Sequence, residues 1–374
     1  MGSSDIRSKR QAFTQEIRLA WPGLHLVVGV ALVSRYFHSL FSGTLLGNAI
    51  SEILIAILLG LYIRALFGCS PKLAPGIAFS MKKVLRFGII LLGLRLSIQD
   101  IGATGWRGLG LILICLAIAL GASFFAKRLF RISPRLAALI GVGTAICGNS
   151  AIIATAPVIE ADEEEVSFAV ATITLFGLIA VLTYPIIGRL LSLPDHYFGF
   201  WSGTAVNDTS QVVAVSAMYS DIAQNVATII KLTRNALMAP IIMMIGMLYH
   251  RWKFQTNQKT ETSSKVRVSI KKSIPGFVIG FILMALLRTF GIMLGVLPQN
   301  VAEPGDLQAA ANSLIFLDSV SRFAILMALS AVGLNTDLAS LKRIGYKPLI
   351  VGLIVAVLLS AVSLLLILFT PLAG

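Results

Sequence analysis

The chain has 374 residues, of which 56% are hydrophobic and 13% are charged, and its formal net charge is +14. A soluble domain of this length has too little interior for so much apolar side chain, so the composition excludes an ordinary water-soluble protein. The basic residues occur in short clusters between apolar runs, which is typical of charges that orient membrane helices and excludes a nucleic-acid partner. The long, continuous apolar runs predict helices and not the short alternating strands of a membrane barrel.

The apolar runs predict an all-α polytopic membrane protein with about eleven transmembrane helices. A hydrocarbon core roughly 30 Å thick needs about 20 apolar residues per helix, and each run is close to that length. In chain order, the predicted spans are 24–40, 48–68, 77–98, 107–127, 135–158, 166–192, 200–220, 226–249, 274–296, 310–334 and 348–370.

Positive charge recurs at every second loop, for example in the clusters Lys127–Arg135 and Arg251–Lys272, whereas Glu160–Glu165 is acidic. The positive-inside rule then predicts a cytoplasmic N-terminus and an external C-terminus in a bacterial inner membrane. The predicted organisation is a cytoplasmic segment over 1–23, eight spans over 24–251, a basic cytoplasmic loop over 252–273 and three spans over 274–374.

Two segments, 141–150 and 203–211, predict interrupted helices. They share the pattern Gly-Thr-Ala-aliphatic-x-x-x-Ser, which begins at Gly143 and at Gly203. Glycine frees the backbone, and unwound backbone survives inside a bilayer only where protein or a wet cavity covers it. Paired interrupted spans of this kind are typical of the binding site of a transporter; small-residue helix packing is the alternative.

The eighth predicted span carries two cations three residues apart, Lys231 and Arg234, which share one helix face. Buried cations need a counter-charge or an anionic ligand, and Asp208 is the natural protein partner. Snorkelling of Lys231 towards the interface is the alternative. A second ionisable pair, Asp318 and Arg322, is spaced for an ion pair within one helix.

A short echo links Val84-x-Arg86-Phe87-x-Ile89 to Val320-x-Arg322-Phe323-x-Ile325, in spans that run in opposite directions, as inverted repeats require. The charge pattern orients the fifth and seventh spans alike, although crossed interrupted helices usually run oppositely. Either the segment 200–220 is a re-entrant hairpin or the span count is off by one.

The motifs at 143–152, 203–214 and 231–234 resemble those of the YeiH-like bacterial membrane proteins, which are described as sulfate exporters. In that family a His commonly precedes the acidic residue of the second motif; here Asn207 stands there, which leaves Asp208 as the titratable group. Segments 93–100 and 333–337 are more distantly similar to span ends of the bile acid/sodium symporter and cation–proton antiporter superfamily. That resemblance implies a core domain with crossed, broken helices, a panel domain, and often a homodimer.

These patterns predict a secondary active transporter of a small anion such as sulfate or a sulfonate, with Asp208 as the coupling group for H⁺ or Na⁺. No catalytic residue, metal site or other cofactor is expected, and the partners are the anion and the lipid bilayer. The alternatives are a cation/proton antiporter and an anion channel; an enzyme is disfavoured because protease motifs are absent. The predicted substrate-binding residues are Thr144, Cys147, Asn149, Ser150, Asn207, Thr209, Ser210, Gln211, Lys231 and Arg234.

Overall fold

In a computed structural model, every regular element is a helix among the described residues, which are 3–41, 51–68, 70–255, 276–298, 307–336 and 346–369. Six of these helices are long and apolar enough to cross a membrane, or seven if one bent pair counts as a single span. The predicted all-α membrane class is thus confirmed, whereas two of the eleven predicted spans, 135–158 and 200–220, turn back as described below.

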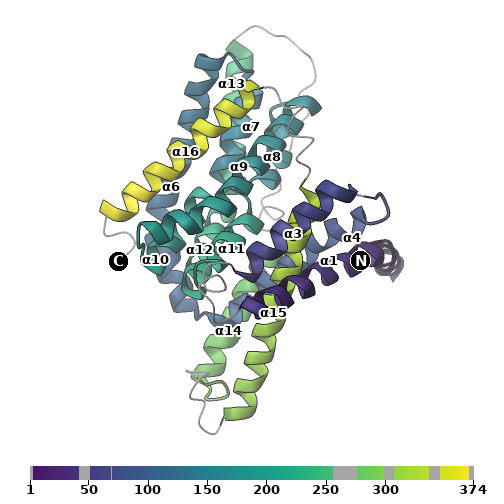
Figure 1. The fold of residues 1–374 in the computed structure, drawn as a ribbon. Helices are drawn as coiled ribbons and strands as arrows, with labels where there is room; N and C mark the ends of the chain where they lie inside the picture. Colours follow the sequence, from purple (N-terminus) through teal and green to yellow (C-terminus); the bar gives the residue numbers. More distant parts are fainter. Residues whose placement is uncertain are drawn as a thin grey trace. The chain divides into compact units, whose positions relative to one another are not determined.

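The chain divides into two compact units, one of residues 1–97 with 280–338 and one of residues 98–279 with 339–374. The first unit, unit 1, contains α1 (Ser3–Phe41), α3 (Glu52–Phe67), α4 (Ala74–Phe79), the π-helix η1 (Ser80–Val84), α5 (Leu85–Leu92), the 3₁₀-helix η2 (Gly93–Arg95), most of α14 (Gly276–Met293) and α15 (Gln308–Asn335). The second unit, unit 2, contains α6 (Ile98–Phe130), α7 (Pro134–Ala145), α8 (Asn149–Thr155), the 3₁₀-helix η3 (Ala156–Val158), α9 (Glu163–Leu190), α10 (Asp195–Ala205), α11 (Thr209–Ala217), α12 (Asp221–Ala236), α13 (Met238–Gln255) and α16 (Tyr346–Phe369) (Figure 1).

Two predicted polar segments are partly helical. α1 is one continuous helix that includes most of the predicted N-terminal segment 1–23, and α13 continues into the predicted loop to Gln255. The rest of that loop, 256–273, lies outside the described residues, as does Asp337 of the second superfamily motif.

Unit 1 is held by close helix packing and one partly exposed ion cluster. A β-carbon on Gly60 would lie 2.7 Å from the Ser330 carbonyl oxygen, so only glycine allows α3 to approach α15 this closely. Arg322 Nε donates to Asp318 at 2.9 Å, which confirms the predicted pair, and Arg95 donates to the same carboxylate.

The two segments of the predicted echo lie side by side in unit 1 and run in opposite directions. Ser321 Oγ donates to the Gly88 carbonyl at 2.8 Å, whereas Arg95, further along the chain, reaches back to Asp318 on α15. α5 and α15 are therefore antiparallel, as an inverted repeat requires.

In unit 2, α7 and α8 form a helix hairpin (the first hairpin) and do not continue as one span. A β-carbon on Gly143 would lie 2.9 Å from Ile152, so α8 runs back along α7 (Figure 1). The start of α7 also lies beside the start of α9: Ser133 Oγ donates to Glu165, and Arg135 lies 3.5 Å from Asp162. We call this the Ser133 end of unit 2.

The helices α10 and α11 form a second hairpin that returns to the opposite end of unit 2. Tyr219 Oη, just after α11, donates to the Leu193 carbonyl at 2.5 Å, and the Tyr219 ring stacks on Phe198 near the start of α10. Arg189 Nη2 donates to the Met218 carbonyl at 3.2 Å. We call this the Leu193 end.

Because α9 crosses unit 2 once between them, the hairpins enter from opposite ends. At about 1.5 Å per residue, this helix of 28 residues is long enough to span a bilayer. Predicted spans 135–158 and 200–220 are therefore helix pairs that turn back, and the open orientation of 200–220 is settled as a hairpin. Arg189 consequently lies at the opposite end from Arg135, although both would lie at one end if 135–158 and 166–192 each crossed the membrane once.

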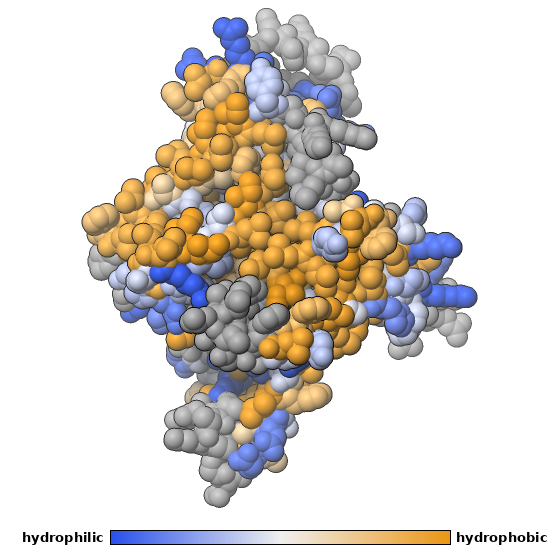
Figure 2. All heavy atoms as spheres, in the orientation of Figure 1, coloured by the Kyte–Doolittle hydropathy of each residue, from blue (hydrophilic) through white to orange (hydrophobic). Residues whose placement is uncertain are grey.

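Large apolar side chains are exposed on both units. Phe67 is 80% exposed, Leu190 79% and Phe369 81%, and apolar residues cover much of the face in Figure 2. Such extensive apolar exposure is expected of a protein whose solvent is lipid.

Cysteine labelling tests the hairpin topology. In a background without the native cysteines, we expect Arg128→Cys and Glu164→Cys to react with an impermeant maleimide from the same side of the membrane. His196→Cys and Asp221→Cys should react only from the other side, because α9 separates the two pairs. Right-side-out and inverted vesicles provide the measurement, and reaction of positions 128 and 164 from opposite sides would refute the first hairpin.

Candidate functional site

The tip of the first hairpin is the short connection 146–148 between Ala145 and Asn149. Gly148 has a φ of +67°, a conformation that residues with a side chain rarely adopt. The glycine therefore ends the path of α7 and lets the chain turn into α8. The predicted interruption at 141–150 is confirmed at this point.

The tip of the second hairpin is capped by its own side chains. After Ala205 the backbone becomes extended, and Asp208 Oδ1 accepts hydrogen bonds from the backbone N (2.9 Å) and Oγ (2.6 Å) of Ser210. Gln211 Oε1 accepts from the Asp208 backbone N at 3.3 Å, which completes a capping box at the start of α11. The predicted interruption at 203–211 is therefore a capped helix start.

The two tips touch. A β-carbon on Gly148 would lie 3.3 Å from both the Cα and Oδ2 atoms of Asp208. The shared Gly-Thr-Ala pattern thus marks two backbone breaks that meet inside unit 2, each reached from a different end.

Helix α12 brings Lys231 against both tips. Its Nζ donates to the carbonyl oxygens of Ile146 at 2.8 Å and Val206 at 3.1 Å, and also to that of Asn207. These three acceptors use the three N–H donors of an ammonium group. Lys231 lies about 15 Å along α12 from its first residue, near the expected middle of a bilayer.

One turn further, Arg234 binds both hairpins in the same way. Nε donates to the Ala145 carbonyl at 3.0 Å and Nη2 to that of Thr144 at 2.7 Å, both at the end of α7. Nη1 donates to the carbonyls of Gly203 at 2.8 Å and Thr204 at 2.7 Å, both at the end of α10. One guanidinium therefore joins the C-terminal ends of two helices.

These contacts explain how the two cations are accommodated. The last carbonyls of a helix lack partners within it and carry partial negative charge, which a cation neutralises. Lys231 is 0% and Arg234 1% exposed, so neither head group snorkels to an interface. Neither forms an ion pair with Asp208 in the part of the chain that the structure describes; the predicted partnership is replaced by backbone carbonyls.

The predicted site residues fall into an accessible group and a buried group. Ser150 is exposed, and Asn149, Asp208 and Thr209 are half-buried at the starts of α8 and α11. The buried predicted residues are Thr144, Cys147, Asn207, Ser210, Gln211, Lys231 and Arg234. A solute approaching the tips would meet the accessible group first and the cations only through the tip backbones.

Thr174 and Gly177 on α9 and Asn235 on α12, for which the sequence predicted no role, contact the hairpin tips. Asn149 Nδ2 lies 3.5 Å from Thr174 Oγ1 on α9, and Gln211 Nε2 donates to the Thr174 carbonyl at 3.3 Å. The Gln211 side chain occupies the space above Gly177, where a β-carbon would lie 1.8 Å from its Oε1. Asn235 on α12 is the third of these residues. In the sequence, all three are marked by a polar side chain or a glycine inside an apolar span.

Within the part of the chain that the structure describes, three amide oxygens around the tips have no hydrogen-bond partner. Oδ1 of Asn149, Asn207 and Asn235 are all buried and unpaired. Asn235 reaches Thr209 through its Nδ2 at 3.5 Å, which places it at the start of α11. The described residues hold no group of three His, Cys, Asp or Glu side chains suited to a metal ion.

Replacing Lys231 tests its role in holding the tips. Lys231→Met keeps the length of the side chain but removes the donor to the Ile146 and Asn207 carbonyls and leaves that of Val206 with the 3.3 Å bond from Arg234. We therefore expect the free energy of unfolding to fall by about 3–5 kcal/mol. Lys347→Met, at an exposed position, should change it by less than about 0.5 kcal/mol. Thermal unfolding in detergent measures both, and equal stability of the two variants would contradict the tip contacts.

A double substitution tests the packing of the Gln211 side chain against Gly177. Gly177→Ala should displace the Gln211 amide and cost about 1–3 kcal/mol, because the bonds to Asp208 and Thr174 are lost. In a Gln211→Ala background, the same change at Gly177 should cost little more. Additive losses in the thermal unfolding of the two single variants and the double variant would show that the residues act independently.

Comparisons with known proteins agree with the motifs. The sequence profile of the family described as "Conserved hypothetical protein 698" matches residues 22–352. A UPF0324 membrane protein of Streptococcus pyogenes serotype M6 is 36% identical over 92% of this chain and 95% of its own length. Those of Clostridium tetani (31% identical, 92% and 95% covered) and Listeria monocytogenes serotype 4b (33%, 95% and 97%) are similar along nearly their whole length too.

No solved structure matches the chain. The profile covers most of the sequence, including both hairpin tips and α12, and the relatives align over 92–95% of the chain. The resemblance to YeiH-like proteins is confirmed, and the chain belongs to this UPF0324 family of membrane proteins.

Proposed function

We propose that this protein is a secondary active transporter that carries a small anion past the two hairpin tips by alternating access. The observation that carries the proposal is the meeting of two opposed hairpins on the buried pair Lys231 and Arg234. Broken backbone at membrane depth is tolerated where it lines a site, and such sites are typical of transporters.

The charge balance at the tips favours an anion. Among the described residues of unit 2 away from its two ends, the charged side chains near the tips are Lys231, Arg234 and Asp208, which together carry one net positive charge. The two helix C-termini offset part of the cationic charge, but the starts of α8 and α11 face the same region with the opposite polarity. A negative solute would therefore be stabilised there.

The same balance suggests a coupling scheme. A dianion such as sulfate would exceed the single positive charge by one, and protonation of Asp208 or one Na⁺ would restore neutrality. The exposed Ser150 and the half-buried Thr209, which directly follows Asp208, are the groups whose hydroxyls would hydrogen-bond the oxyanion. The remaining buried polar residues of the tips, with Cys147, would then shape and support the site.

Localisation in the bacterial inner membrane is part of the proposal. Lys127, Arg128, Arg131, Arg135 and Arg251 all lie at the Ser133 end of unit 2. The positive-inside rule assigns this end to the cytoplasm and, through the predicted topology, places the N-terminus there as well. Homodimer formation remains a prediction.

A cation/proton antiporter is the second candidate, favoured by the three unpaired amide oxygens. Oδ1 of Asn149, Asn207 and Asn235, with the carboxylate of Asp208, are hard oxygen ligands of the kind that Na⁺ binds. Lys231 and Arg234 oppose this reading, since two cations close to the site raise the cost of binding a third.

Counterflow in proteoliposomes tests the anion proposal. Vesicles loaded with unlabelled sulfate, sulfite, thiosulfate or a sulfonate should accumulate labelled substrate when the loaded anion is transported. A channel would pass current without such exchange, and exchange of Na⁺ for H⁺ with none of these anions would establish the antiporter instead.

Variants at the tips refine this test. Thr209→Val and Ser150→Ala should each raise KM by about 10- to 150-fold, because a hydrogen bond to a charged ligand contributes about 1.5–3 kcal/mol. Thr183→Val is the matched control and should leave KM unchanged, because the Thr183 hydroxyl bonds within α9 to the Ile179 carbonyl. An unchanged KM in both tip variants would show that the substrate does not bind at the hairpin tips.

A further inference from the structure

A groove of about 490 Å³ lies between α6, α7 and α13 at the Ser133 end of unit 2. Its volume falls within the roughly 300–1,000 Å³ of pockets that bind small molecules. Most of the lining is apolar, and its walls open outwards, since Phe124 is 63% and Leu248 57% exposed. The groove therefore faces the apolar surroundings of the protein.

Two cations, Lys127 and Arg135, lie among the lining residues. Lys127 Nζ sits 4.0 Å above the ring of Phe124 in the last turn of α6, where the apolar span ends. Arg135 Nε donates to Tyr249 Oη at 3.3 Å, so it joins the first hairpin to α13 across the groove. The described lining contains no carboxylate, which makes the groove positive as well as apolar.

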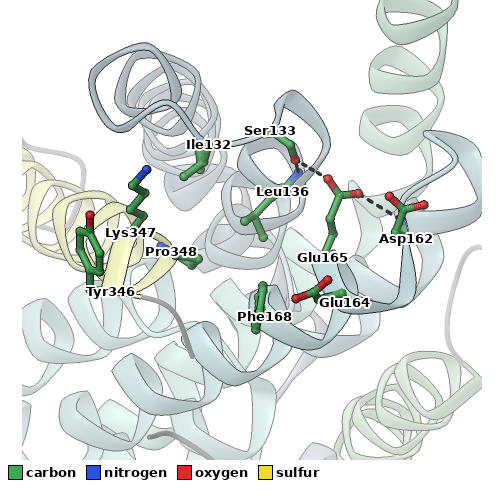
Figure 3. A pocket seen from close by; sticks show the side chains of 10 residues that line it. All are labelled: Ile132, Ser133, Leu136, Asp162, Glu164, Glu165, Phe168, Tyr346, Lys347 and Pro348. Carbon is green, nitrogen blue, oxygen red and sulfur yellow. Dashed lines mark hydrogen bonds between the residues drawn. The ribbon is translucent and has the colours of Figure 1, made fainter. Parts of the chain in front are cut away.

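The acidic residues of this end gather in a separate pocket. Figure 3 shows Asp162, Glu164 and Glu165 on one side of a pocket of about 360 Å³, with Lys347 across from them. Arg135 contacts Asp162 at 3.5 Å, but this carboxylate lines the acidic pocket and not the groove. The carboxylates Asp162, Glu164 and Glu165 thus line the acidic pocket and are not among the residues that line the groove.

We propose that the groove binds an anionic phospholipid, with an acyl chain along the apolar walls and the phosphate at Lys127 and Arg135. Cationic side chains at the end of a membrane span lie at headgroup level, and basic pockets between such helices bind anionic lipid headgroups. A water-soluble anion would use the two cations but would leave the exposed apolar walls unmatched. Phospholipid satisfies both parts of the groove.

The lipid would also brace the first hairpin. Pro134, Arg135 and Ala138 belong to α7, whereas Met244 and Leu248 belong to α13. A single acyl chain between them contacts both helices, so occupancy should stabilise the base of the hairpin whose tip Arg234 holds.

Thermal unfolding of the full chain in detergent tests the proposal, with added phosphatidylglycerol or phosphatidylcholine of identical acyl chains. We expect phosphatidylglycerol to raise the midpoint more than phosphatidylcholine. Lys127→Gln should weaken the apparent affinity about fivefold, as expected for one cation near a lipid surface. Arg128→Gln makes the same charge change at an exposed neighbour outside the groove and should keep the wild-type response.

A groove-filling variant and a soluble headgroup separate the remaining explanations. Ala138→Phe should abolish the selective shift by occupying the space of the acyl chain; if it does not fold, the comparison of positions 127 and 128 still decides. Equal shifts with both lipids would overturn the proposal. So would equal losses in Lys127→Gln and Arg128→Gln, or a full response to glycerol phosphate alone.

Discussion

The architecture of unit 2 depends on two side chains of α12 that neutralise the broken ends of two helices. Each hairpin interrupts a helix inside the protein and leaves carbonyls that no neighbouring turn can satisfy. Lys231 and Arg234 donate to carbonyls of both hairpins. The carbonyls thereby offset the cost of burying the two charges, and the cations offset the cost of burying unpaired carbonyls. Without the cations the tips would expose backbone at membrane depth, and without the tips the cations would be unpaired charges.

This mutual dependence also determines which side chains of the tips are accessible. The carbonyl ends of α7 and α10 are turned towards α12, so the starts of α8 and α11 carry the accessible groups Ser150 and Thr209. Positive charge from α12 acts on that surface through the tip backbones. The connection from α9 to both hairpins, through Thr174 and Gly177, fixes the relative positions of the two starts.

Much of the helical plan could be predicted because it follows from local composition. The predicted span 166–192 corresponds to α9, and 348–370 corresponds to α16, each within a few residues. The interruptions were also predictable, since glycine and small polar residues mark them. The reversal at the first break was not predicted, and a hairpin at 200–220 was one of two alternatives, because a reversal depends on contacts between distant residues, such as Ser133 with Glu165. The acceptors of Lys231 and Arg234 were equally hidden, since a backbone carbonyl has no signature in the sequence.

The order of the chain has a consequence for how the protein is made. Both hairpins emerge from the ribosome before Lys231 and Arg234, so their tips are synthesised without the donors that later satisfy them. None of the four hairpin helices, α7, α8, α10 and α11, is long enough to cross a bilayer by itself. Until α12 is translated, we therefore expect the tip carbonyls of the nascent hairpins to be hydrated or bound by a chaperone. Membrane insertion of this region would then be completed only after α12 has been synthesised.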